Sequence, residues 1–200
     1  QNRMGIGDTV IFLPFIKAIS EKYNSPISLL VKENSKANEF LYETNYIDKI
    51  LILERGKNSN KTRHNGFFGS INLIKDLKKY NFNKIFIFNS SLRFNLVAKL
   101  SGISEIYQYP LFSKTHQHII DTPKKFLREK LNINEIGDPE IHINADSISQ
   151  SFKKFNIDKN KINILLGIGG SGPTKRVPSR IFINFMEKIS KIKKCKFYLA

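Results

Sequence analysis

Residues 5–31 read GIGDTVIFLPFIKAISEKYNSPISLLV and join one helical pattern to one strand pattern. The stretch 9–22 is apolar on nearly every side, which is typical of a helix that is buried all round. The run ISLLV at 27–31 is short, apolar and strand-like. A buried helix that leads directly into a buried strand is one unit of a layered α/β protein. We therefore expect the fold to be built outward from this segment.

The same alternation continues along the chain. The runs KILIL at 49–53 and KIFIF at 84–88 are also strand-like, and their near-continuous apolar character suits parallel strands that are covered on both faces. Four further stretches have the spacing or the capping residues of helices: 35–42, 70–80, 92–100 and 122–133. This order predicts a doubly wound α/β sheet.

The pattern restarts after Asn144 and indicates a second domain. A helical stretch at 145–157 precedes the strand-like KINILLGIG at 161–169, a glycine-rich loop, and a helix over 180–192. We expect one Rossmann-like domain over 1–158 and the truncated start of a second over 159–200. Because the chain begins with Gln1 and stops within a strand-like run, we also expect a fragment that lacks both ends, including the first strand of the first domain.

The composition is that of a globular protein with a large positive charge. Hydrophobic residues make up 40% of the 200 residues, and the formal net charge is +16. This charge suits an acidic partner such as nucleic acid, anionic lipid or a phosphorylated sugar, but dispersed lysines also follow from AT-rich coding. No apolar run is long enough to cross a bilayer. A lone cysteine, Cys195, excludes an internal disulfide and suits a reducing cytoplasm.

The loop after the 161–169 strand has the layout of a phosphate-binding site. It offers glycines that allow close backbone approach, hydroxyl groups and a cation, namely Gly170, Gly172, Ser171, Thr174 and Lys175. A helix follows at once, and the amide-rich start of a helix attracts anions. The Gly-Lys-Ser/Thr ending of a Walker A loop is absent, and the Gly-x-Gly-x-x-Gly match is only formal. A glycine-rich turn with surface charges is an equal alternative.

The first loop places Asp8 between a glycine pair and the apolar run. Asp is a good residue for the start of a helix, and capping is the usual role of an acid in this position. The following helix is apolar on nearly every face, so its amino end must lie in a crevice or at a sheet edge. An Asp there can also act as a general base. The residues alone leave both roles open.

Three other features have weaker interpretations. Arg93 follows a strand end and suits contact with an acceptor phosphate or carboxylate, or a plain surface position on a first helical turn. The loop 54–69 either embraces an anionic acceptor or is a solvated loop. His116 and His118 suggest a metal pair with Asp121, but their spacing does not place them on one helix face, so we expect no metal site. There is no recognisable nucleic-acid motif, so we expect no nucleic-acid partner.

Four segments in order resemble glycosyltransferase family 9, the lipopolysaccharide heptosyltransferases. The segment 5–31 resembles the family's opening pattern of Gly-Asp, a short apolar run, Pro, an apolar helix and a strand. The next two resemble its following strand and its strand, Ser/Arg turn and helix, and the fourth resembles the opening of its second domain; they lie at 46–53, 82–103 and 165–189. Val177 stands where that second-domain opening usually has Trp.

The resemblance implies a GT-B fold, in which two Rossmann-like domains face each other across the active site. The domain over residues 1–158 would bind the acceptor, and 159–200 would begin the domain that binds the nucleotide sugar. Asp8 would be the catalytic base. The donor phosphates would lie against Lys175 and Ser171, with Gly170, Gly172 and Thr174 in the same loop. Gly7 and Arg93 would face the acceptor.

The activity implied is inverting transfer of a sugar from a nucleotide-diphosphate donor, ADP-heptose-like, to a lipopolysaccharide-type or other cell-envelope saccharide. The acceptor would be anionic or lipid-linked, and the protein would be cytoplasmic, with peripheral contact at the inner face of the inner membrane. No cofactor or metal is implied. We expect the 200 residues alone to be inactive. Two rivals remain open: a Rossmann-type nucleotide-binding enzyme of another class, and a basic module that binds nucleic acid.

Overall fold

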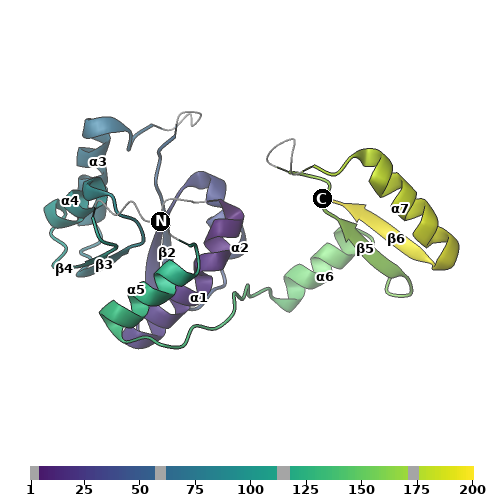
Figure 1. The fold of residues 1–200 in the computed structure, drawn as a ribbon, viewed down its shortest axis with the longest axis horizontal. Helices are drawn as coiled ribbons and strands as arrows, with labels where there is room; N and C mark the ends of the chain where they lie inside the picture. The colour runs from purple at the N-terminus through teal and green to yellow at the C-terminus, as the bar shows by residue number, and fades with distance from the viewer. Residues whose placement is uncertain (1–4, 57–61, 112–117, 171–175) are drawn as a thin grey trace. The chain divides into compact units, whose positions relative to one another are not determined.

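The computed structural model describes residues 5–56, 62–111, 118–170 and 176–200. The chain divides into two compact units, Gln1–His142 and Ile143–Ala200 (Figure 1). The described segment 132–144, which joins them, contains no helix or strand, so the division falls there. The sequence pattern predicted a domain boundary after residue 158. The helix over 145–154, which that prediction assigned to the first domain, belongs to unit 2.

Helices and strands alternate through unit 1. Its elements are α1 (Ile6–Tyr23), β1 (Ile27–Val31), the short 3₁₀ helix η1 (Glu33–Ser35), α2 (Ala37–Phe40), β2 (Ile47–Ile52), α3 (Gly66–Lys78), β3 (Lys84–Ile87), α4 (Leu92–Leu100), β4 (Glu105–Gln108) and α5 (Asp121–Leu131). The α/β class expected from the sequence is therefore confirmed.

The strands of unit 1 pair in parallel but do not form one sheet. β1 pairs with β2, with Leu30 opposite Leu51, and β3 pairs with β4, with Phe86 opposite Tyr107. Within the described parts of the chain each pair is a separate two-stranded sheet. The single doubly wound sheet that the sequence pattern predicts is not seen among the described residues, where the strands of unit 1 form two separate pairs.

The main core of unit 1 is built around α1. Leu13, Phe15 and Ile19 on this helix are almost wholly inaccessible to solvent, as the apolar sequence of the helix predicts. Aromatic rings extend the core toward the other strand pair, since Phe88 lies edge-on to both Phe12 and Phe126. A second cluster joins α3 and α4, and its buried members are Leu53, Leu73, Leu77 and Val97.

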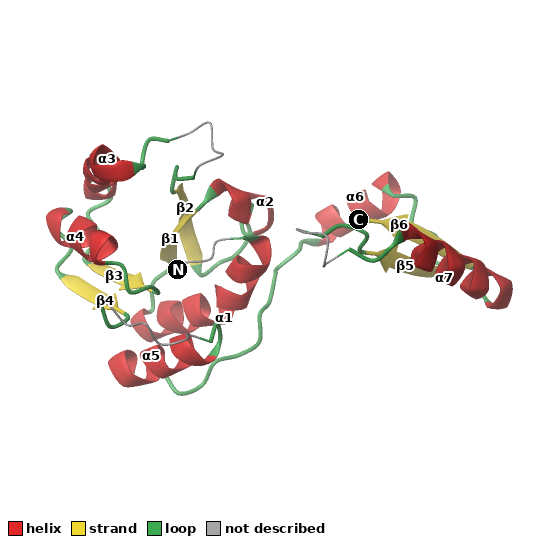
Figure 2. Cartoon of the chain, turned by 45° about the horizontal axis from the view of Figure 1, so that its top comes forward, coloured by secondary structure: helices red, strands yellow, loops and turns green. Residues whose placement is uncertain are grey.

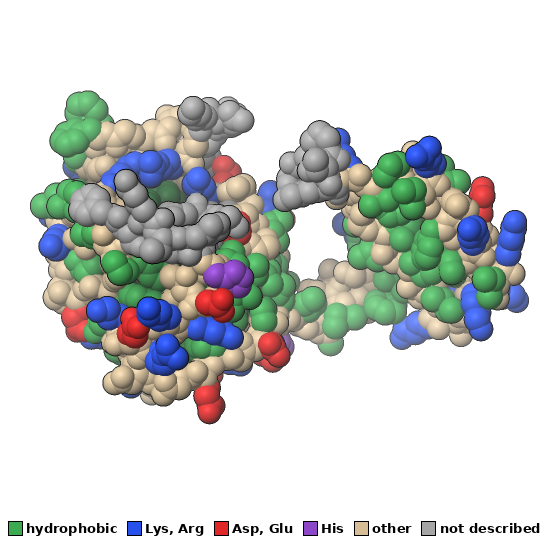
Figure 3. All heavy atoms as spheres, in the orientation of Figure 1, with side chains coloured by type: hydrophobic (Ala, Val, Ile, Leu, Met, Phe, Trp, Pro, Cys, Tyr) green, Lys and Arg blue, Asp and Glu red, His purple; other side chains and the backbone are tan. Residues whose placement is uncertain are grey.

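Unit 2 contains α6 (Ala145–Lys154), β5 (Ile162–Leu166), α7 (Ser179–Ile192) and β6 (Cys195–Leu199). β5 and β6 are parallel, and α7 lies along one face of the pair (Figure 2), where Phe185 meets Phe197. Neither α6 nor α7 has a buried residue. Hydrophobic side chains instead gather on the surface of this unit (Figure 3).

No helix in the described ranges is both long enough and apolar enough to span a membrane.

Candidate functional site

Asp8 lies in the first turn of α1, and its carboxylate holds the start of the helix. The backbone amide of Gly5 donates to Asp8 Oδ2 over 3.1 Å, and Thr9 Oγ1 donates to the Gly5 carbonyl over 2.9 Å. Asp8 is half-buried. Capping, which the sequence favoured, is therefore present. Among the described residues only Oδ2 of this carboxylate has a hydrogen-bond partner, so Oδ1 is available to another group.

The amino end of α1 lies at the carboxyl edge of both strand pairs of unit 1. α1 contacts η1, which directly follows β1. One turn beyond Asp8, Phe12 packs against Phe88, which directly follows β3. Thr9 and Asn89 line one cleft between these elements. Ligands of parallel α/β sheets bind at the carboxyl edge, and Asp8 lies at this edge.

Gly7 leaves open space beside Asp8. A methyl group built on Gly7 would meet no heavy atom within 4 Å. The first hydrogen bond of α1 runs from the Thr9 amide to the Gly5 carbonyl, so the amides of Ile6, Gly7 and Asp8 precede the helical ladder. Backbone donors at an uncrowded helix start attract anions or polar hydroxyl groups. Among the described residues, Gly7 is therefore uncrowded at the start of α1.

A hydrogen-bonded turn carries Arg93 at the end of β3. Asn89 Oδ1 accepts from the Ser91 amide over 2.9 Å, and the Gln108 side-chain amide donates to the carbonyls of both residues over 3.0 Å. The turn is thereby tied to β4, and α4 begins at Leu92. Arg93 is thus presented from a fixed first turn rather than from a free loop.

The Arg93 guanidinium is partly buried and incompletely paired. One terminal nitrogen donates to the His64 carbonyl over 2.6 Å. Nε is buried and has no hydrogen-bond partner in the described part of the chain. Burial, and then the charge of the nearby Arg55, lower the pKa of Arg93. A partly buried guanidinium with an unsatisfied buried donor suits an anionic ligand.

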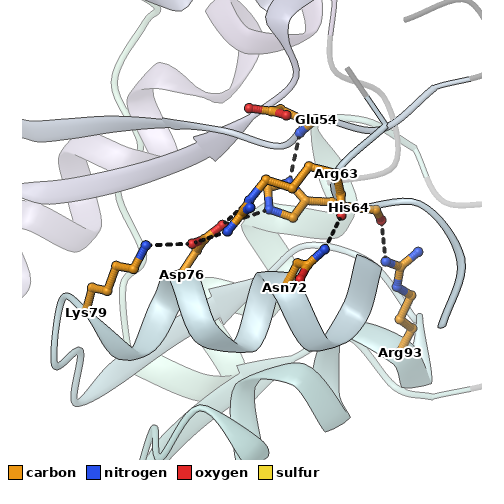
Figure 4. Close-up of polar contacts among 7 residues, drawn as sticks. All are labelled: Glu54, Arg63, His64, Asn72, Asp76, Lys79 and Arg93. Atoms are coloured by element: carbon orange, nitrogen blue, oxygen red, sulfur yellow. Dashed lines mark hydrogen bonds and ion pairs between the residues drawn. The ribbon is translucent and has the colours of Figure 1, made fainter. Parts of the chain in front are cut away.

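His64 and Asp76 form the centre of a polar network beneath this region (Figure 4). His64 Nδ1 accepts from the Glu54 amide over 3.0 Å, so its proton lies on Nε2, which is 3.1 Å from Asp76 Oδ2. Arg63 binds both oxygens of Asp76 over 2.9 Å, and Lys79 binds Oδ1 over 2.9 Å. The hydrogen bonds from Arg63, followed by those from Lys79 and His64, hold the pKa of Asp76 well below its usual range.

This network divides the described basic residues of the 54–69 loop into two groups. Arg63 and His64 are held by Asp76, and the Arg63 carbonyl accepts from Asn72 over 3.0 Å. They position the loop and do not present themselves to an acceptor. Arg55 has no such partner among the described residues and lies near Arg93. Asp76 was not predicted, because its only signal in the sequence was an acid on the polar face of a predicted helix.

In unit 2 the glycine-rich loop leaves the carboxyl edge of the β5–β6 pair. The amides of Ile168 and Gly169 donate to the Ala200 carbonyl over 2.8 and 3.3 Å. Arg176 Nε donates to the Gly170 carbonyl over 3.1 Å, so the two described flanks of the loop touch. Four of the predicted donor-site residues lie outside the described residues: Ser171, Gly172, Thr174 and Lys175.

His118, the described member of the histidine pair, has a structural role. His118 Nδ1 lies 3.0 Å from Asp121 Oδ2 at the start of α5. His116 lies outside the described residues. The described ranges of the chain hold no group of three or more His, Cys, Asp or Glu side chains arranged for a metal.

Comparison with solved structures gives matches over nearly the whole chain. A glycosyl transferase family 9 protein from Veillonella parvula DSM 2008 matches with a TM-score of 0.75 and 17% identity, over 98% of this chain and 59% of its own. E. coli ADP-heptose lps heptosyltransferase II matches with a TM-score of 0.73 and 12% identity, over 98% of this chain and 62% of its own. The chain therefore spans about three fifths of the length of either structure.

No protein-family model matches the sequence, and no curated protein matches it either. The likeness lies in the fold, because identities of 12% and 17% retain little sequence signal. It confirms, at the level of fold, the resemblance that four sequence segments indicated. The chain has the parallel α/β fold of solved glycosyl transferase family 9 structures.

Proposed function

We propose that the protein is a glycosyltransferase of the heptosyltransferase type, with a GT-B arrangement of two Rossmann-like domains. One observation carries the proposal: 98% of the chain, including residues of both units, superposes on each of two glycosyl transferase structures. The position of Asp8 at the carboxyl edge of unit 1 supports the same function, because a group at this edge can reach a bound ligand.

In this proposal Asp8 is the general base. Its Oδ1 takes the proton from an acceptor hydroxyl while Oδ2 stays bound to the Gly5 amide. The acceptor oxygen forms a bond to the anomeric carbon of the donor sugar as the bond from that carbon to the diphosphate breaks. The electron pair leaves with the nucleotide diphosphate, and the configuration at the anomeric carbon is inverted. General-base assistance of this kind contributes about 10²–10⁴ in rate.

Acceptor recognition falls to unit 1. Gly7 gives an acceptor hydroxyl room to approach Asp8. The partly buried guanidinium of Arg93, with the exposed Arg55 near it, suits an acidic group such as a carboxylate or phosphate on a saccharide. Such an acceptor is cell-envelope or lipid-linked in character. The net charge of +16 supports work at an anionic membrane surface from the cytoplasmic side.

Donor binding falls to unit 2. The hydrogen bond from Arg176 to the Gly170 carbonyl joins the two flanks of the loop 170–176. The loop lies at the carboxyl edge of β5 and precedes α7. We assign the diphosphate of an ADP-heptose-like donor to the loop residues Ser171, Thr174 and Lys175, with the backbone of Gly170 and Gly172 beside it. The positive charge of Lys175 and the amides at the start of α7 would stabilise the negative charge that grows on the leaving group.

The full-length protein tests this function directly. We would incubate it with a panel of nucleotide-diphosphate sugars, ADP-heptose included, and with acidic saccharide acceptors, and follow transfer by mass spectrometry. The anomeric configuration of the product, measured by NMR, should be inverted relative to the donor. Lys175→Ala should raise KM for the donor, and Lys188→Ala on α7 serves as a matched control. Nicotinamide-dependent turnover, or salt-sensitive DNA binding without transfer, would overturn the proposal.

A further inference from the structure

His64 is a buried histidine whose ring joins two elements of unit 1. Its side chain is almost wholly inaccessible to solvent. Nδ1 accepts from the amide of Glu54, which follows β2, and Nε2 lies at hydrogen-bond distance from Asp76 on α3 (Figure 4). A buried ring with both nitrogens satisfied is held in one orientation. The ring therefore ties the end of β2 to α3.

The backbone of His64 is fixed from the same two sides. Its amide donates to the Glu54 carbonyl over 3.0 Å, so the two residues are bonded twice. On the other side, a methyl group built on Gly69 of α3 would come within 2.6 Å of the His64 carbonyl oxygen. Asn72 of α3 also binds the carbonyl of the preceding residue, Arg63. The direction of the His64 carbonyl is therefore set by β2 and α3.

This carbonyl is the acceptor for Arg93, which lies on α4. A terminal guanidinium nitrogen donates to it over 2.6 Å, a short distance that suits a charge-assisted hydrogen bond. In the described ranges of the chain, the buried Nε of the same group has no partner. A guanidinium carries five N–H donors in one plane, so most of them remain for a ligand. The bond to His64 thus orients donors that other groups can use.

Two effects act against this position of the Arg93 side chain. Burial lowers its pKa, and so, to a smaller extent, does the positive charge of Arg55. A desolvated cation near a like charge is favoured to rotate into solvent, where the side chain also regains conformational entropy. The His64 carbonyl opposes this rotation because it offers a negative partial charge at the partly buried position. The position of Arg93 therefore depends on His64.

We propose that His64 is a positioning residue of the acceptor site. Held by Asp76 and by the Glu54 amide, it directs its carbonyl to Arg93 and fixes the guanidinium for the acidic group of an acceptor. This inference rests on the proposed function, in which Arg93 binds that group. A guanidinium that is fixed before binding loses little entropy when the acceptor arrives, and its planar donors match a carboxylate or phosphate. His64 therefore acts on the affinity for acidic acceptors and not on the chemical step.

Two substitutions separate the two ring bonds of His64. His64→Asn keeps an acceptor near the position of Nδ1 but does not reach Asp76, whereas His64→Gln keeps a donor near the position of Nε2 but loses the acceptor for the Glu54 amide. In the full-length protein each should raise KM for a phosphorylated saccharide acceptor about tenfold, with kcat within about twofold. His118→Asn, at an exposed histidine outside this network, is the matched control and should change neither constant.

A double-mutant cycle separates positioning from a general loss of stability. Arg93→Ala should raise the same KM about 10–100-fold. His64→Asn should add nothing in that background, because its effect passes through Arg93. The dephosphorylated form of the same acceptor is the second probe, and its KM should not respond to His64→Asn. An equal increase in both backgrounds, or for both acceptors, would overturn the proposal.

A measurement without substrate separates this proposal from the reaction. The heteronuclear NOE of the Arg93 Nε–H group in the full-length protein reports its motion on the picosecond-to-nanosecond timescale. It should match that of ordered backbone amides and fall in both His64 variants. A mobile Arg93 in the unmodified protein, or one equally ordered in the folded variants, would overturn the proposal. The expected NOE pattern without any sugar transfer would contradict the proposed function and still support the positioning of Arg93 by His64.

Discussion

Units 1 and 2 are built from the same α/β repeats but differ in how much they bury. In unit 1, α1 alone contributes Leu13, Phe15 and Ile19 to the core, and α3, α4 and α5 each bury residues as well. In unit 2, α6 and α7 bury nothing, and Leu165 of β5 is 69% exposed. A parallel sheet needs helices on both faces, and a single strand pair with two helices does not supply them.

The two units therefore differ in what stabilises them. Unit 1 encloses hydrophobic clusters, so its stability is a property of its own residues. Unit 2 has a complete hydrogen-bonded strand pair and strongly amphipathic helices but no enclosed core among its described residues. Unit 2 therefore leaves large apolar side chains of its described elements exposed.

The largest expected effect on stability tests this contrast. In the 200-residue chain Leu13→Ala, at a fully buried position, should lower the free energy of unfolding by about 2–5 kcal/mol. The matched change Leu165→Ala in unit 2 should cost less than about 0.5 kcal/mol, because the side chain is largely exposed. Urea unfolding followed by circular dichroism measures both. Equal costs would remove the distinction between the units.

A pair of glycines in unit 1 gives a smaller and sharper effect. A methyl group on Gly69 in α3 would come within 2.1 Å of the His64 backbone, whereas Gly7 has open space. Gly69→Ala should therefore cost about 1–3 kcal/mol, since the 54–69 loop must move. Gly7→Ala should be neutral or stabilising by up to about 1 kcal/mol, because alanine favours helix. Thermal unfolding of the two variants compares them, and a tolerated Gly69→Ala would contradict the close approach.

The Asp76 network should make the stability of unit 1 dependent on pH. Because its partners lower the folded-state pKa of Asp76, this contribution is complete above the unfolded pKa of about 4. It is lost as the pH falls through the folded value. Asp76→Asn should cost about 1–2 kcal/mol at pH 7 and flatten the acid limb of the stability profile. Asp138→Asn, at an exposed position outside this network, is the control and should leave the stability profile unchanged.

Much of the fold followed from local sequence pattern. The predicted strand 27–31 and helix 92–100 coincide with β1 and α4, and the apolar stretch at 9–22 lies within α1. The short strand β4 was not predicted, because EIYQ mixes polar and apolar residues and pairs only through its contact with β3. Periodicity also does not show which strands pair, since pairing is a property of the whole sheet.

The candidate site was predicted less completely. Asp8 stood out because an acid precedes an apolar helix, and its hydrogen bond to Gly5 confirms the capping role in that interpretation. The Asp76 network could not be read from the sequence, because its members are spread over 54–79 and meet only when α3 packs beside the loop. The role of Arg93 likewise depended on a backbone carbonyl, that of His64, which no side-chain pattern reveals.

The most direct test of the central claim is the single-turnover rate of sugar transfer by full-length Asp8→Asn. Asparagine keeps an oxygen for the Gly5 amide, so the helix start and the unfolding midpoint should be retained, while the proton acceptor is lost. We predict a rate lower by about 10²–10⁴, with Asp121→Asn, another acid in a first helical turn, at the rate of the unmodified enzyme. Full transfer activity in Asp8→Asn would contradict the account.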